Sequence, residues 1–130
     1  MPRQAIVLFA HGSRDPLWSR PVEAVAARIR AVDAAVLVAC AYLELMAPDL
    51  PLAVRTLVAE GATKIKVVPM FLGVGRHARE DLPRLLEVLI REYAHIDFVL
   101  QQAVGEDPRI VDLLARVALG QPLAPSTTRI

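Results

Sequence analysis

The feature that most constrains the fold is a regular alternation of short apolar runs with segments whose apolar residues recur at helical spacing. A short continuous apolar run is typical of a strand that is covered on both faces. Three such runs occupy residues 5–10, 34–42 and 65–70. A fourth run, residues 96–101, alternates apolar and polar side chains and predicts a half-exposed edge strand. Apolar residues at steps of three and four predict helices over about residues 16–32, 50–60, 82–93 and 108–119.

Strands that alternate with helices in this way form a parallel sheet with right-handed crossovers. The commonest small arrangement is flavodoxin-like, with strand order 2-1-3-4 and helices on both faces. We therefore expect a single α/β domain over residues 1–120, followed by a flexible tail over residues 121–130. In this order the first and third strands are neighbours, and ligands bind beyond the carboxyl ends of the strands at that point.

Two of the predicted helices carry more specific expectations. Pro83 disfavours helical geometry at Leu82, so the third helix is expected to begin near Leu82, with residues 77–81 as an irregular entry. The last helix opens at Pro108 and is expected to bury an apolar stripe. The members of that stripe are Ile110, Leu113, Leu114 and Val117. Trp18, in the first helical stripe, is expected in the core.

Composition excludes several classes of protein. The 130 residues are 55% hydrophobic, which is enough to bury a core, and 15 basic against 14 acidic residues argue against binding to nucleic acid. The single cysteine, Cys40, excludes an intrachain disulfide framework and a four-thiolate zinc site, and indicates a reducing compartment. No apolar run approaches the roughly 18 residues of a membrane span. We expect a cytoplasmic protein that does not bind membranes.

Three side chains suited to metal chemistry follow neighbouring strands. His11 comes directly after the first strand, Glu44 after the second, and His77 in the loop after the third. Because neighbouring strands lie about 4.8 Å apart, these side chains can stand in a row across roughly 10 Å of sheet edge. Two imidazoles and a carboxylate suit a borderline divalent metal with coordination positions left open. The remaining histidine, His95, is expected at the opposite end of the sheet.

The same loops carry residues suited to a substrate. Arg14, Arg76 and Arg79 form a local cluster in a nearly neutral chain, which favours a small molecule with several carboxylates. Ser13, Gly73 and Gly75 lie beside them, and glycines allow a close approach to something flat or bulky. Residues 73–78 also satisfy G-x-G-x-x-A, the pattern of a dinucleotide-binding turn. Pro83 and the lack of an acidic residue after the next strand argue against that interpretation.

Several segments in this pattern resemble the class II tetrapyrrole chelatases, and among them the short sirohydrochlorin cobaltochelatases. The similarity covers residues 5–118, nearly the whole chain. The segments that carry it are Ile6 to Pro16, Tyr42-Leu43-Glu44, Val68 to Leu72, Gly75-Arg76-His77 and Asp81-Leu82-Pro83. Ala47 departs from the pattern, because family members often carry a second acid before this proline.

The resemblance implies insertion of Co²⁺ into sirohydrochlorin with release of two protons, as a step of cobalamin biosynthesis. Cobalt is then a substrate, no organic cofactor is needed, and the short forms act as homodimers. His11 and His77 match the metal-binding histidines of the family, and Glu44 matches its acidic residue. Insertion of iron or nickel remains an alternative. So do a non-catalytic metal carrier and a flavodoxin-like domain that binds nucleotides or other anions.

Overall fold

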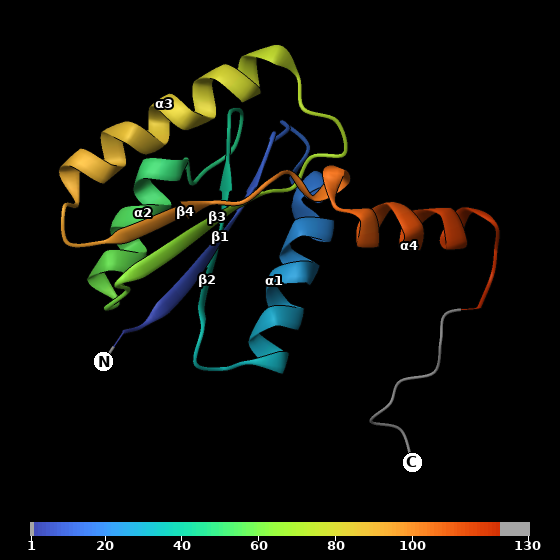
Figure 1. The fold of residues 1–130 in the computed structure, drawn as a ribbon, viewed down its shortest axis with the longest axis horizontal. Helices are drawn as coiled ribbons and strands as arrows, with labels where there is room; N and C mark the ends of the chain where they lie inside the picture. Colours follow the sequence, from blue (N-terminus) through green and yellow to red (C-terminus); the bar gives the residue numbers. More distant parts are fainter. Residues whose placement is uncertain (1, 123–130) are drawn as a thin grey trace.

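The fold is a four-stranded parallel sheet with helices on both faces, as predicted (Figure 1). The computed structural model describes residues 2–122. The strands are β1 (Gln4–Ala10), β2 (Leu37–Tyr42), β3 (Lys64–Pro69) and β4 (Asp97–Leu100). Their order is β2-β1-β3-β4, and every pairing is parallel. β4 alternates between exposed and partly buried residues, which confirms the predicted edge strand.

Residues 2–122 also form four α-helices and two short 3-10 helices, of which the last of each kind follows β4. The helices are α1 (Arg20–Val32), α2 (Leu50–Ala59), α3 (Arg76–Glu92) and α4 (Pro108–Ala118). The 3-10 turns are η1 (Pro16–Ser19) and η2 (Val104–Glu106). Local sequence explains where α2 begins, because Pro51 suits a first turn and the Asp49 side chain accepts a hydrogen bond from the Leu52 amide at 3.0 Å. Among residues 2–122, every helix is too short or too polar to cross a bilayer.

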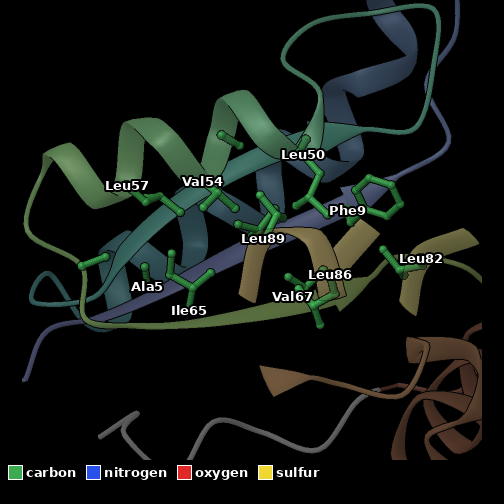
Figure 2. Packing of buried hydrophobic residues seen from close by; sticks show 14 of the residues in the cluster. Ala5, Phe9, Leu50, Val54, Leu57, Ile65, Val67, Leu82, Leu86 and Leu89 are labelled. Carbon is green, nitrogen blue, oxygen red and sulfur yellow. The ribbon is translucent and has the colours of Figure 1, made fainter. Parts of the chain in front are cut away.

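The two faces of the sheet are covered unequally. α2 and α3 cover one face and form the main core with β1 and β3 (Figure 2). The side chains at the centre of that core are Val7, Phe9, Leu50, Val54, Leu57, Ile65, Val67 and Leu89. On the other face, α1 buries Val22 and Ala26 against a second, smaller cluster around Leu8 and Tyr42. Apolar burial therefore concentrates on the α2–α3 face.

The carboxyl ends of the three strands β2, β1 and β3 lie together at one edge. Ala5 is opposite Leu37 on one side and Ile65 on the other, so the strands run in step. Backbone hydrogen bonds extend this pairing beyond the strands. Leu43 donates to the Ala10 carbonyl at 2.9 Å, and Met70 donates to the Phe9 carbonyl at 2.7 Å. The loops after these strands are therefore held in fixed relative positions.

The predicted start of the third helix is wrong. α3 begins at Arg76, so the expected irregular entry is its first turn, and Pro83 lies inside the helix. Pro83 lacks an amide hydrogen, so α3 loses one backbone hydrogen bond there. Pro83 lies on the side of the helix that is exposed to solvent. The opposite side buries Ala78, Leu82, Leu86 and Leu89 against the sheet. This burial outweighs the local preference of the residue before proline.

The predicted burial of the last helix is also wrong. Leu113, Leu114 and Val117 are 42%, 44% and 60% exposed, and Ile110 is only partly buried. Figure 1 shows α4 projecting away from the sheet instead of packing on it. The residues of η2 turn the chain outward before α4 begins, so its apolar stripe has no surface of its own chain to cover among residues 2–122.

Smaller differences concern single residues and the chain end. Trp18 is 38% exposed rather than in the core, and its ring meets Tyr42 edge to face with centroids 6.3 Å apart. The second strand begins at Leu37, because residues 34–36 belong to the turn before it. The predicted tail at residues 121–130 lies almost entirely outside the described residues.

Candidate functional site

His11 and Glu44 are held side by side by the backbone. The Glu44 amide donates a hydrogen bond to the His11 carbonyl at 3.0 Å, which continues the β1–β2 ladder by one step. Gly12 has a φ of +96°, and a Cβ added there would lie 1.9 Å from the Glu44 carbonyl oxygen. Only glycine fits this position, because the two loops touch through their backbones. The predicted neighbourhood of His11 and Glu44 is present at the backbone.

The His11 imidazole packs against the aromatic ring of Phe71. Its ring lies 4.3 Å from the ring of Phe71, centroid to centroid, at an angle of 31°. Phe71 is 2% exposed and in turn meets Phe9 edge to face, with centroids 6.1 Å apart. His11 itself is exposed. The buried Phe71 ring therefore supports the accessible His11 imidazole, and this contact joins the loop after β1 to the loop after β3.

His77 lies at the same edge of the sheet, in the segment that follows β3. It lies in the first turn of α3, which begins directly after the loop that follows β3, and its side chain is exposed. Gly75 precedes the helix and provides no side-chain cap, so the first amide groups of α3 are left for other partners. Both histidines are thus accessible at the carboxyl edge of the sheet, where the sequence predicted them.

The chain does not form a closed metal site. Across residues 2–122, no three side chains from histidine, cysteine, aspartate and glutamate are grouped so that they could hold one metal ion. The row of His11, Glu44 and His77 therefore follows the sheet edge without converging on a common point in this conformation. A metal ion held by the two histidines alone would have coordination positions left open.

The loop after β1 is organised by its own polar side chains. The Ser13 hydroxyl accepts a hydrogen bond from the Asp15 amide at 3.0 Å. The Asp15 carboxylate accepts one from the Leu17 amide at 2.9 Å and so begins η1. Ser13 therefore has a structural task in addition to the substrate contact predicted for it. Arg14, between these residues, is exposed.

The three predicted arginines are all exposed. Arg76 pairs with Glu80 one helical turn later, with 3.3 Å between Arg76 Nε and Glu80 Oε1. An exposed pair of this kind is weak, so it competes little with a ligand carboxylate. Arg79 lies in the first turns of α3, beside a small cavity of about 120 Å³ under the start of that helix. The first turns of α3 therefore carry two exposed arginines together with the acidic residues Glu80 and Asp81.

Glycine is not required at Gly73 or Gly75 by the packing of this chain. A Cβ added at either position would meet no atom within 4 Å, and neither residue has a positive φ. The space above both residues is open. By contrast, a Cβ at Gly105 would lie 2.0 Å from the Leu72 carbonyl oxygen, and the Gly105 amide donates to the Phe71 carbonyl at 2.9 Å.

Gly105 and the support that Phe71 gives to His11 were not predicted. The hydrogen bond from Gly105 joins η2 to the backbone of Phe71, in the loop after β3. This contact joins residues more than thirty positions apart, so no local motif announces it. Two exposed leucines in the loops at this edge of the sheet were not predicted either. Leu45 and Leu72 follow β2 and β3 and are 53% and 67% exposed.

The larger cavities lie away from the histidines. A groove of about 600 Å³ runs between α1 and the loop after β2, and one of about 610 Å³ lies at the opposite end of the sheet. Neither is lined by His11 or His77. Cys40 and Tyr42 line the first groove, and burial raises the pKa of both groups. Cys40 therefore remains a neutral thiol, which is a poor metal ligand.

Known proteins match this fold and this chain length. The CbiX family model matches residues 5–119. The sirohydrochlorin cobaltochelatase of Methanococcus aeolicus is 28% identical over 141 residues, which cover 90% of this chain and 99% of that protein. A crystal structure of a CbiX protein from Marinobacter aquaeolei VT8 has a TM-score of 0.78 and 32% identity, and the match covers 90% of this chain and 95% of that one.

A longer protein also contains this fold. The sirohydrochlorin chelatase SirB from Bacillus subtilis subspecies spizizenii, solved in complex with cobalt, has a TM-score of 0.76 and 27% identity. The match covers 91% of this chain and 50% of SirB. The family match of residues 5–119 includes α1 to α4 and both histidines of the sheet edge. The chain therefore belongs to the CbiX family.

Proposed function

We propose that this chain inserts Co²⁺ into sirohydrochlorin or a similar tetrapyrrole with several carboxylates. The observation that carries the proposal is the His11 imidazole, exposed and supported by Phe71, at the same sheet edge as the exposed His77. Family membership supports it, as does the chemistry of the surrounding residues. Cobalt is a substrate in this reaction, and the proposal requires no organic cofactor.

The residues match what metal insertion requires. The ring exchanges two pyrrole protons for one divalent ion, so the net reaction releases two protons. His11 and His77 hold the ion, and the remaining coordination positions are open for the ring nitrogens. When the ion passes to the ring, a histidine that releases it has a free ring nitrogen, and this nitrogen accepts one of the pyrrole protons. Glu44, exposed beside His11, passes protons to solvent.

The surroundings suit a flat ring with acidic substituents. Leu45 and Leu72 offer exposed apolar side chains in the loops after β2 and β3. Arg14, Arg76 and Arg79 bind the carboxylates of the ring, and guanidinium groups pair with carboxylates through two parallel hydrogen bonds. The open space over the loop with Gly73 and Gly75 lets a ring approach the backbone. Ser13 has its hydroxyl hydrogen left to donate to the substrate.

We further propose that the enzyme works as a homodimer in the cytoplasm. Both histidines are exposed at an open edge of the sheet, which leaves room for a second copy to approach the ring. The reducing compartment follows from the single cysteine, whose thiol is half-buried and neutral.

The test is metal insertion followed by the change in the visible absorption of sirohydrochlorin. Purified protein is compared with Co²⁺, Fe²⁺ and Ni²⁺ at equal concentrations, and we expect the fastest insertion with Co²⁺. His77→Ala and His11→Ala should each lower kcat about 100-fold or more, the size typical of a lost proton acceptor. His95→Ala is the matched control, because His95 is an exposed histidine at the amino-terminal end of β4.

Each alternative predicts a different experimental result. A metal carrier would bind Co²⁺ without accelerating insertion. Faster insertion of Fe²⁺ or Ni²⁺ would contradict the choice of metal and leave the reaction class standing. Stabilisation by nucleotides but not by Co²⁺ in a melting experiment would indicate an anion-binding domain instead. Activity of His77→Ala close to that of the unmodified protein at saturating cobalt would remove His77 from the mechanism.

A further inference from the structure

Leu45, in the loop after β2, combines two features that are unfavourable for a leucine. Its φ is +68°, and across residues 2–122 it is the one residue other than glycine in the left-handed region. That region brings the Cβ of an L-residue close to the following carbonyl oxygen, so a bulky residue there costs free energy. Its side chain is also 53% exposed, so burial against this chain offsets little of the cost. Backbone strain of this kind concentrates at functional sites.

The path of the loop explains the left-handed turn but does not explain the leucine. The Tyr42 amide donates a hydrogen bond to the Pro48 carbonyl at 2.9 Å, which closes the loop over residues 42–48. Within this loop, the Glu44 amide is bonded to the loop after β1, and Met46 packs against the smaller cluster on the α1 side of the sheet. Leu45 turns the chain between these two contacts. Glycine or asparagine adopts this conformation at lower cost, so the loop does not require a leucine.

Leu45 lies directly beside the residues of the proposed site. It follows Glu44, whose amide donates to the His11 carbonyl at 3.0 Å, and the two loops lie side by side at the carboxyl edge of the sheet (Figure 1). Gly12 allows this approach, because a Cβ there would lie 1.9 Å from the Glu44 carbonyl oxygen. That carbonyl belongs to the peptide unit that joins Glu44 to Leu45. The backbone of Leu45 is therefore held in a fixed position relative to His11.

A second exposed leucine lies on the other side of β1. Leu72 follows Phe71 in the loop after β3 and is 67% exposed, and a Cβ added to Gly105 would lie 2.0 Å from its carbonyl oxygen. Because β2 and β3 both pair with β1, His11 follows the strand between the two leucines. Leu72 has no positive φ, so its exposure carries no backbone cost. Of the two, Leu45 alone combines exposure with an unfavourable backbone conformation.

On the basis of the proposed function, we propose that Leu45 packs against one apolar face of the tetrapyrrole, while the exposed arginines bind its carboxylates. A tetrapyrrole is a flat conjugated ring, so its faces are apolar even though its rim carries acids. Contact with such a face buries the Leu45 side chain and so offsets the free-energy cost of its backbone conformation. The tetrapyrrole is the molecule that must approach His11 and Glu44, so it also passes beside Leu45.

The test is the affinity of the full-length protein for metal-free sirohydrochlorin, measured by titration of its visible absorption in the absence of cobalt. Leu45→Asn removes the apolar contact but introduces a residue that tolerates the left-handed region. We expect its dissociation constant to rise about 10- to 100-fold, the size expected when one leucine side chain is buried, while the melting temperature does not fall. Leu45→Met keeps an apolar side chain of similar size and should retain most of the affinity.

Val32→Asn is the matched control. Val32 is 73% exposed and ends α1, directly before the turn into β2, so this change removes an exposed apolar side chain away from the site. Its affinity for sirohydrochlorin should equal that of the unmodified protein. Analytical ultracentrifugation should give Leu45→Asn the same mass as the unmodified protein. A smaller mass would show that Leu45 contacts a second copy and would overturn the contact with the ring.

Ionic strength separates the apolar contact from the arginine contacts. Salt screens exposed charge pairs but does not screen apolar burial. The loss of affinity in Leu45→Asn should therefore be the same at low and high sodium chloride, while the loss in Arg76→Gln should shrink at high salt. A loss in Leu45→Asn that disappears at high salt would mean that the variant displaces charged groups, and it would overturn a direct contact.

The remaining outcomes separate the Leu45 contact from the proposed function. Unchanged affinity in Leu45→Asn would overturn the contact, and insertion of Co²⁺ by the unmodified protein would still support the proposed function. Weaker binding by Leu45→Asn in a protein that inserts no metal would support the contact and overturn the chemistry. An unmodified protein that does not bind sirohydrochlorin would overturn both. A lower melting temperature together with lost affinity in Leu45→Met would give Leu45 a structural role instead.

Discussion

At the scale of single residues, the site depends on groups that carry no chemistry of their own. Phe71 supports the His11 ring from below, and Gly12 and Gly105 let loops approach each other closely enough to hold that arrangement. An added methyl group at either glycine, or loss of the Phe71 ring, would displace His11 relative to its neighbours. Positioning of this kind matters because small misplacements of a reacting group can cost about 100-fold in rate.

Gly12→Ala should lower both stability and activity. The added Cβ would overlap the Glu44 carbonyl oxygen, and alanine is strained at a φ of +96°. Backbone strain alone costs about 1–3 kcal/mol, and relief of the overlap must separate the loops that carry His11 and Glu44. We expect a lower melting temperature together with a lower insertion rate. The rate should fall even at temperatures where circular dichroism shows the variant to be fully folded.

The control for that variant is Gly73→Ala. Gly73 lies in open space without a positive φ, so an added methyl group meets no protein atom there. Its free energy of unfolding should change by no more than about 0.5 kcal/mol, which is the range of a neutral surface substitution. Its melting temperature should therefore stay close to that of the unmodified protein. Equal melting temperatures for Gly12→Ala and the unmodified protein would contradict the account of the β1–β2 loop contact.

The sequence was sufficient to predict where His11 and His77 lie, because both follow strands whose ends share one edge. Whether their side chains converge could not be predicted. That depends on side-chain rotamers and on the direction in which the ring of Phe71 packs. The role of Phe71 was not predicted, because its contact with His11 joins residues 60 positions apart in the sequence.

At the scale of helices and strands, the burial of apolar side chains explains which predictions were confirmed and which were wrong. The strands and their order were predicted because continuous apolar runs leave few alternatives in a small α/β domain. The start of α3 was mispredicted because a local rule about proline competes with the burial of Ala78 and Leu82. The environment of α4 was mispredicted for a different reason. An apolar stripe indicates that a helix is covered, but not by which chain.

The beginning of α4 should show a distinctive pH dependence. The hydrogen bonds from Arg109 to the Asp107 carboxylate lower the pKa of that carboxyl from its ordinary value of 3.8 to about 2. A folded-state pKa below the unfolded one means that this contact stabilises the start of α4 fully above pH 3.8. The stabilisation is lost as pH falls through about 2. Carboxyl carbon chemical shifts should therefore give Asp107 a midpoint near 2.

Arg109→Gln provides the comparison for that titration. Without the guanidinium, the midpoint of Asp107 should rise toward 3.8, while the amide bond from residue 109 continues to cap the helix. The amide signals of the first turn of α4 would then change at higher pH than in the unmodified protein. A midpoint that stays near 2 in Arg109→Gln would show that another group is responsible for the low pKa.

At the scale of the whole molecule, stability is distributed unevenly over the sheet. β1 lies at the centre, pairs on both sides and buries Val7 and Phe9 almost completely. The face under α2 and α3 has the larger core, and the opposite face is only half covered. β4 is a short edge strand, and α4 buries no side chain of its own. Elements with few buried contacts open at a lower free energy than the core.

Native-state hydrogen exchange should follow this order and should also report the second copy. We expect the slowest exchange in β1 and β3, faster exchange in β4, and the fastest in α4 at low protein concentration. If α4 packs on another chain, its amides gain protection as concentration rises, because association stabilises only the bound form. The amides of β1 should not change with concentration below the global unfolding limit. Protection of α4 that is the same at every concentration, in a protein shown to be dimeric, would place the interface elsewhere on the molecule.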